Sequence, residues 1–202
     1  MITMSGKPCS GKSTISKILK KDYGFEIFSV GDIFREIATQ QNMTVNELND
    51  KLTNSLDSKL DIILDTKVLE MYIQHFNEDV IIESRTAPCF APLAYKVYTD
   101  ITTQEQIKRL VNSKRKNEDI SPEKALFNLT KRENDESERY LELYHFDNRE
   151  LSHYDHVLDT SNITPQQGAK QVFEGYLKYK EARKNSPEIP DGHEFSLTFK
   201  RK

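Results

Sequence analysis

Apolar residues follow two alternating patterns along this chain: short, nearly continuous runs and longer stretches with helical spacing. The short runs predict five strands, at residues 2–4, 25–29, 79–83, 95–99 and 155–160. The longer stretches and their start signals predict helices at 12–22, 32–41, from 44, 56–76, 103–116, from 122 and 164–184. Strands that alternate with helices in this way predict an α/β fold, with a parallel sheet covered by helices on both faces.

The pattern also sets the domain organisation. We expect one domain over residues 1–184, followed by a tail over 185–202 that contains Pro187, Pro190 and Gly192. The end of this tail, from Glu194 to Lys200, alternates apolar and polar residues. Two interpretations stay open: a mobile basic tail, or an edge strand or segment that docks on a partner.

Composition narrows the class of protein. The chain has 202 residues, 36% of them hydrophobic and 30% charged, with a net charge of −3. This charge argues against binding to DNA or RNA, because no basic excess is present to neutralise phosphates. Two cysteines give no disulfide framework, and no apolar run approaches a membrane span. The first strand leaves no room for a signal peptide, so we expect a cytoplasmic protein. We also expect it to be a monomer.

The segment after the first strand matches a phosphate-binding loop, GxxxxGKS followed by Thr, and leads into a helix. Backbone N–H groups and the helix N-terminus would face a phosphate, Lys12 would neutralise it, and the Ser13 hydroxyl would bind Mg²⁺. The predicted triphosphate-binding residues are Gly6, Lys7, Pro8, Cys9, Ser10, Gly11, Lys12, Ser13 and Thr14. The motif therefore predicts a nucleoside triphosphate site.

A second substrate segment is predicted where the next strand ends. Ser29, Gly31 and Asp32 lie at the start of a helix, and Arg35 follows one turn later. Crevices at the carboxyl ends of parallel strands bind ligands, and an arginine binds phosphate with two parallel hydrogen bonds. The alternative is an ordinary surface arginine on a capped helix.

Charged residues also end the third strand. Glu83 is a candidate for ordering magnesium-bound water, and Arg85 is a candidate for the same acceptor phosphate as Arg35. A solvated loop is the alternative.

Two basic clusters lie further along the chain. Arg132, Glu136 and Arg139 share one helix face, a spacing that is also usual for surface ion pairs. Arg115 lies within a basic triplet, which predicts either a lid over residues 112–120 that covers phosphates or a solvated run of charge.

The sequence resembles the cytidylate kinases, a short-lid group within the P-loop nucleoside monophosphate kinases. The matching segments are GKPCSGKST, SVGDIFREIA, MTVNELNDKL, VIIESR, KRENDESERYLELYHFD and YDHVLDTS. The resemblance implies a three-layer α/β/α fold with a five-stranded sheet. ATP would bind at the first loop, and CMP or dCMP under residues 30–76.

The resemblance also implies roles for individual residues. Arg35 and Arg85 would hold the CMP phosphate, while Arg132 and Arg139 would bridge the donor and acceptor phosphates. Glu136 would lie near the cytosine edge or orient those arginines. Arg115 would be the lid arginine, and catalysis would rest on Lys12 and on the arginines at 115, 132 and 139.

The chain departs from the family pattern where Ser84 replaces a usual glycine between Glu83 and Arg85. The Gly-Phe-Pro-Arg-type segment of adenylate kinases is absent, which disfavours AMP as acceptor. Two other functions stay open. One is a kinase of another small acceptor, such as a different nucleotide, a coenzyme precursor or shikimate. The other is a regulatory or assembly factor gated by a nucleoside triphosphate.

Overall fold

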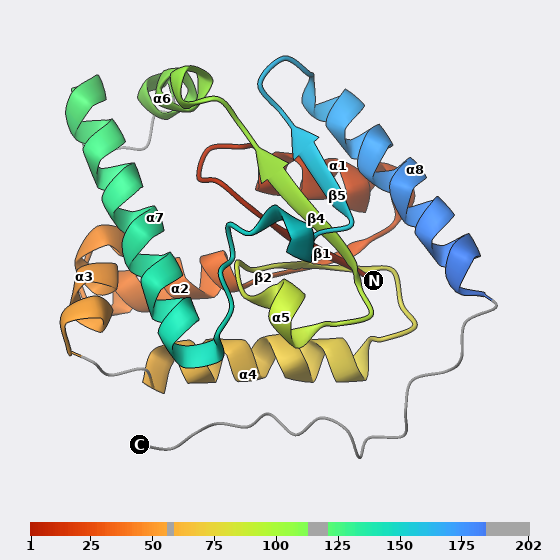
Figure 1. The fold of residues 1–202 in the computed structure, drawn as a ribbon, viewed down its shortest axis with the longest axis horizontal. Coiled ribbons are helices and arrows are strands. Elements are labelled where there is room, and N and C mark those ends of the chain that lie inside the picture. The colour runs from red at the N-terminus through yellow and green to blue at the C-terminus, as the bar shows by residue number, and fades with distance from the viewer. Residues whose placement is uncertain (56–58, 113–120, 185–202) are drawn as a thin grey trace.

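The structure is a computed structural model that describes residues 1–55, 59–112 and 121–184. Its centre is a parallel sheet of five strands in the order β2-β3-β1-β4-β5 (Figure 1). The strands are β1 (Ile2–Gly6), β2 (Glu26–Ser29), β3 (Val80–Glu83), β4 (Tyr95–Asp100) and β5 (His156–Asp159). All five predicted strands are thus confirmed, and their order places β1 at the centre.

Helices connect these strands in the described part of the chain. They are α1 (Lys12–Tyr23), α2 (Val30–Gln40), α3 (Val45–Ser55), α4 (Lys59–Gln74), α5 (Ala87–Phe90), α6 (Thr103–Asn112), α7 (Pro122–Tyr144), the 3₁₀ helix η1 (Leu151–His153) and α8 (Pro165–Arg183). None of the described helices is long and apolar enough to cross a bilayer.

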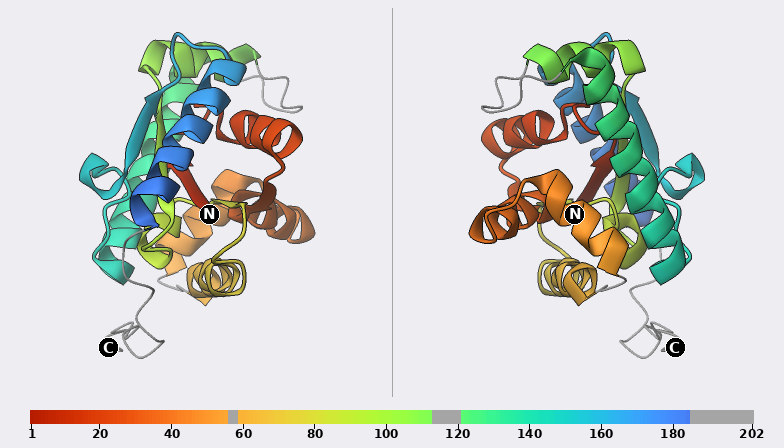
Figure 2. Two further views of the ribbon diagram at one scale, coloured as in Figure 1. Left: turned by 90° about the vertical axis from the view of Figure 1, so that its right-hand side faces the viewer. Right: turned by 90° about the vertical axis from the view of Figure 1, so that its left-hand side faces the viewer.

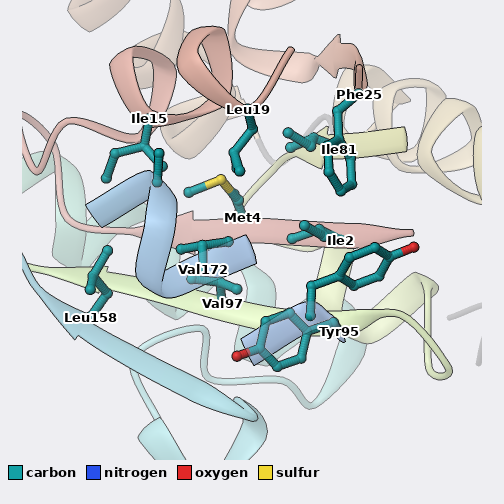
Figure 3. Close-up of a cluster of buried hydrophobic side chains, with 12 residues drawn as sticks. Ile2, Met4, Ile15, Leu19, Phe25, Ile81, Tyr95, Val97, Leu158 and Val172 are labelled. Carbon is teal, nitrogen blue, oxygen red and sulfur yellow. The ribbon is translucent and has the colours of Figure 1, made fainter. Parts of the chain in front are cut away.

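The sheet is packed on both faces, as its apolar runs predict. On one face, α1 and α8 supply Ile15, Leu19 and Val172, which lie against the strands in Figure 3. On the other face, α4 and α5 pack against β3 (Figures 1 and 2). Neighbouring residues of β3 serve opposite faces, since Ile81 belongs to the first core and Ile82 to the second. The predicted three-layer α/β/α arrangement is confirmed.

The helix boundaries differ in places from those expected. The helix α2 begins at Val30 rather than Asp32, because the Ser29 hydroxyl caps it by accepting a hydrogen bond from the Asp32 N–H. The short elements α5 and η1 were not predicted, because three or four residues are too few to show a helical period. The predicted lid is described only at Asn112, so Arg115 and the tail lie outside the described residues.

The carboxyl end of β1 requires a glycine. Gly6 has φ of +127°, and a Cβ there would lie 2.2 Å from the Thr99 carbonyl oxygen of β4. The chain leaves the sheet at this point, and the Lys7 N–H donates to the same carbonyl. The phosphate loop therefore starts directly against the neighbouring strand.

Packing between α8 and β4 gives a stability prediction. A Cβ at Gly175 would lie 2.0 Å from the Tyr95 hydroxyl oxygen, which is hydrogen-bonded to His156. We expect Gly175→Ala to lower the free energy of unfolding by about 1–2 kcal/mol, even though alanine favours helices. Urea unfolding measures this. The exposed Glu174→Ala is the control, with a change within about 0.5 kcal/mol. Unchanged or increased stability of Gly175→Ala would contradict the packing described.

Candidate functional site

A cavity of about 560 Å³ opens at the carboxyl edge of the sheet. This volume is in the range of small-molecule binding sites. Its walls come from the phosphate loop, the start of α2, the end of β3, and the helices α4, α6 and α7. The predicted residues that line it are Pro8, Cys9, Ser10, Gly11, Lys12, Ser13, Thr14, Ser29, Gly31, Arg35, Glu83, Arg85, Arg132, Glu136 and Arg139.

Of the predicted residues that the structure describes, three lie outside this lining. Gly6 supplies its carbonyl oxygen to the loop, and Lys7 pairs with Asp100 at 2.7 Å beside a smaller cavity of about 200 Å³. Asp32 forms an ion pair with Arg35, whose side chain is 51% exposed. Arg35 thus reaches the cavity from an exposed helix, and Asp32 holds its guanidinium.

The phosphate loop has the geometry of an anion site. Gly11 caps α1 with φ of +89°, and Cys9 also has a positive φ of 58°. The buried Ser10 hydroxyl donates to the Lys7 carbonyl, and the Gln106 side chain of α6 donates to the Pro8 carbonyl at 3.1 Å. One hydrogen bond within the loop and one from α6 therefore hold the loop in place, and the N-terminus of α1 faces the cavity.

Lys12 is a buried cation at the centre of this loop. Its Nζ donates to the Gly6 and Lys7 carbonyl oxygens, each at 2.8 Å. Burial, and next the charge of Arg85, lower the pKa of Lys12 to about 7. An anion in the cavity would offset both effects and favour the charged ammonium.

Ser13 and Glu83 meet across the loop. The Ser13 hydroxyl donates to one carboxylate oxygen of Glu83 at 3.0 Å, and the other oxygen, Oε1, is buried without a hydrogen-bond partner. Hydroxyl and carboxylate oxygens are ligands that Mg²⁺ uses together with water and phosphate. This pair therefore fits a magnesium site, although the described residues hold no cluster of three or more His, Cys, Asp or Glu side chains for a metal.

A buried acid joins two predicted phosphate-binding arginines. Glu136 is 4% exposed, accepts from Arg132 Nε at 2.6 Å with Oε1, and forms an ion pair with Arg85 through Oε2. Burial raises the pKa of Glu136, but the charges of Arg85 and Arg132 outweigh burial and hold the pKa below its usual range. Glu136 therefore orients both guanidiniums, from β3 and α7, in the same cavity.

Arg139 has different partners. Its Nε lies 2.9 Å from Asp61 of α4, and its terminal nitrogens donate to Thr53 and Asn49 of α3 at 3.0 and 3.3 Å. Its guanidinium also lies 5.6 Å from the centre of the Tyr140 ring. Arg139 lines the cavity and ties α7 to the helices of the predicted monophosphate segment.

Sequence reasoning missed Arg109 of α6. Its guanidinium donates to the Thr160 carbonyl at 2.6 Å, and its Nη1 would lie 3.8 Å from a Cβ on Gly11. It therefore flanks the phosphate loop and lines the cavity. The sequence did offer one signal for this residue, an arginine on the helix that follows β4. The carboxyl end of β4 lies at the edge of the sheet where the phosphate loop begins.

The other missed residues lie at the α4 end of the cavity. Asp61 and Asp65 are each 5% exposed, and Thr86, Phe34 and Tyr140 also line this end. The sequence did offer one signal, because Asp61 and Asp65 are four residues apart and so lie on the same face of a helix. The same spacing is common on helix faces that are exposed to solvent, so it did not single out these residues.

Removal of the Glu136 charge should weaken the fold in a pH-dependent way. We expect Glu136→Gln to lower the free energy of unfolding by about 3 kcal/mol at pH 7, because Arg85 and Arg132 lose their shared anion. The pKa of Glu136 is lower in the folded than in the unfolded state. The carboxylate therefore stabilises fully above the unfolded-state pKa, and this stabilisation disappears as pH falls through the folded-state pKa.

Urea unfolding of wild type and variant across pH 3–7 measures this difference, which should shrink toward zero in acid. The control is Glu138→Gln, an exposed residue on the same helix. A pH-independent difference would contradict the role assigned to the charge.

Sequence comparisons show the family of this chain. Residues 1–162 match the model of the cytidylate kinase-like family. The cytidylate kinase of Sulfurisphaera tokodaii is 31% identical over 89% of this chain and 96% of its own length. That of Methanococcoides burtonii is also 31% identical, over 80% of this chain and 87% of its own length.

The fold is also similar to solved structures. The shikimate kinase of Bacteroides thetaiotaomicron has a TM-score of 0.57 at 13% identity, over 86% of this chain and 96% of that one. This likeness concerns the fold alone, whereas the family match covers most of the sequence. The predicted resemblance is confirmed: this chain belongs to the cytidylate kinase-like family.

Proposed function

We propose that this protein transfers the γ-phosphate of ATP to CMP or dCMP, giving ADP and CDP or dCDP. One observation carries the proposal: Lys12, Arg85 and Arg132 come from three distant segments and line the same cavity beside the phosphate loop. Membership of the family and the names of its relatives support the pyrimidine acceptor.

The donor end of the site is the phosphate loop. The backbone N–H groups and Lys12 would bind the β- and γ-phosphates, with Arg109 beside them over Gly11. Ser13 and Glu83 would hold Mg²⁺, which neutralises developing charge on the phosphates when bound. Arg115 stays a predicted lid residue, because it lies outside the described residues.

The acceptor end holds a monophosphate with Arg35 and Arg85. A CMP phosphate oxygen would attack the γ-phosphorus in line, and the bond from that phosphorus to the β,γ-bridging oxygen would break. The attacking group is already anionic, so no general base is required. Positioning and charge stabilisation supply the catalysis, and Glu136 supports both by orienting Arg85 and Arg132.

An acceptor screen tests the reaction. We expect ADP release from ATP to be fastest with CMP or dCMP, weaker with UMP and slowest with AMP, GMP and shikimate. A coupled assay of ADP release, with the product identified by chromatography, measures this. Transfer to another acceptor alone would assign a different kinase. ATP hydrolysis without transfer to any acceptor would favour a regulatory factor.

The arginine between the two substrates gives a sharper test. We expect Arg132→Ala to lower kcat on the order of 10³-fold, since one positioned arginine contributes that much to phosphoryl transfer. Arg132→Lys should retain part of the rate, because lysine keeps the charge without the planar fork. The control is Arg149→Ala, whose arginine pairs with Asp147 outside the main cavity. Loss of folded protein in Arg132→Ala, seen by circular dichroism, would instead indicate a structural ion pair.

A further inference from the structure

The wall at the α4 end of the cavity contains a buried carboxylate with an unusual set of partners. Asp65 is 5% exposed and lines the cavity. Its hydrogen-bond donors among the described residues are hydroxyls: Thr86 donates to Oδ1, and Tyr144 donates to Oδ2 at 2.6 Å. The neighbouring acid, Asp61, is paired with Arg139, so that cation is already engaged. Asp65 thus carries its charge into the wall without an ion pair of its own among the described residues.

The hydrogen bonds around Asp65 have a fixed direction. Thr86 uses its single hydroxyl proton toward Asp65, so Ser84, 2.9 Å away, must donate to Thr86. The Ser84 oxygen in turn accepts from the Thr86 N–H. The chain therefore runs from Ser84 through Thr86 to Asp65, and an ionised Asp65 can only accept hydrogen bonds.

This arrangement leaves acceptor capacity at the cavity wall. A carboxylate has about four lone-pair sites, and two hydroxyl donors satisfy half of them. Burial is the largest influence on the Asp65 carboxyl group, whose pKa is raised to about 6. A buried acceptor that faces a cavity is stabilised by a ligand that brings an N–H donor.

A hydrogen bond also links Asp65 to the segment that contains the proposed acceptor phosphate site. Thr86 directly follows Arg85, so the hydrogen-bonded chain begins beside the guanidinium proposed to hold the monophosphate. A nucleotide anchored there would extend its base toward one of the remaining walls of the same cavity. Cytosine presents an exocyclic amine on its Watson–Crick edge, whereas uracil presents a carbonyl oxygen in that place.

We propose that Asp65 is the specificity-determining residue of this site and accepts a hydrogen bond from the 4-amino group of the cytosine base. This inference rests on the proposed function. Uracil would place a carbonyl oxygen against the carboxylate, which repels it. A site built around a hydrogen-bonding group rejects an analogue that lacks the partner far more strongly than an apolar pocket rejects a change of size.

The test compares acceptors in the wild type and in Asp65→Asn. We expect the wild-type ratio of kcat/KM for CMP over UMP to fall about 100-fold in the variant, because the asparagine amide can donate to the uracil O4. Tyr144→Phe is the matched control, since it removes one donor to Asp65 and keeps the carboxylate. The CMP-over-UMP ratio of kcat/KM in Tyr144→Phe should stay within about twofold of wild type, because this variant changes only a supporting partner of Asp65.

A substrate analogue gives the same answer without relying on the variant's folding. The 5′-monophosphate of the 2-pyrimidinone riboside lacks the 4-amino group. Wild type should use it at least tenfold less efficiently than CMP, and Asp65→Asn should discriminate much less. Equal use of both acceptors by wild type, or equal loss toward all acceptors in Asp65→Asn, would overturn the role of Asp65. Failure of wild type to phosphorylate any pyrimidine nucleotide would instead overturn the proposed function.

Discussion

Cations outnumber carboxylates in the main cavity, and the site depends on how this excess positive charge is balanced. Lys12, Arg85 and Arg132 line the same space, and Glu136 pairs with the two arginines. In a low-dielectric interior such like charges repel strongly, which is part of why the pKa of Lys12 falls. Among the described lining residues, six cations (Lys12, Arg35, Arg85, Arg109, Arg132 and Arg139) face four carboxylates (Asp61, Asp65, Glu83 and Glu136), so the cavity has an excess of positive charge and is complementary to an anionic ligand.

The parallel sheet is what allows this balance. All its strands end at one edge, so the loop after β1 and the charged residues at the end of β3 lie side by side. Ser13 and Glu83, for example, are hydrogen-bonded although they are 70 positions apart in the sequence. Gly6 lets β1 end directly against β4. The cations therefore stand on elements packed from both faces, which limits how far they can move apart.

The two ends of the cavity are built differently. At the donor end, backbone groups and cations dominate, and these suit phosphates of any nucleotide. At the other end, the hydroxyls of Ser84 and Thr86 lead to Asp65, a directional arrangement that suits a base edge. Ser84 is the residue at which the sequence departs from the pattern that it resembles, and its hydroxyl both donates to and accepts from Thr86. The departure in sequence is thus part of this polar network.

Much of this protein was determined by local sequence. The apolar runs and alternating patterns predicted all five strands, and the clearest is β3, which is buried along its whole length and has the almost wholly apolar sequence VIIE. The phosphate loop was predicted because glycines, lysine and serine at fixed spacing produce its geometry within nine residues. Arg35 and Arg85 were predicted as well, since each lies near a strand or helix end, and Arg132 was predicted from its place on a charged helix face. The short elements α5 and η1 were missed for lack of a period.

Only the tertiary structure decided which partners these side chains take. The sequence left Glu136 between a role at the base and a role with the arginines. In the structure α7 packs against α3 and α6, and Glu136 pairs with Arg85 and Arg132. The structure also revealed Arg109 and Asp65, which carry no motif of their own. The physical reason is range: backbone conformation and burial are encoded within a few residues, whereas the charge and hydrogen bonds around a side chain depend on segments that only the folded sheet brings together.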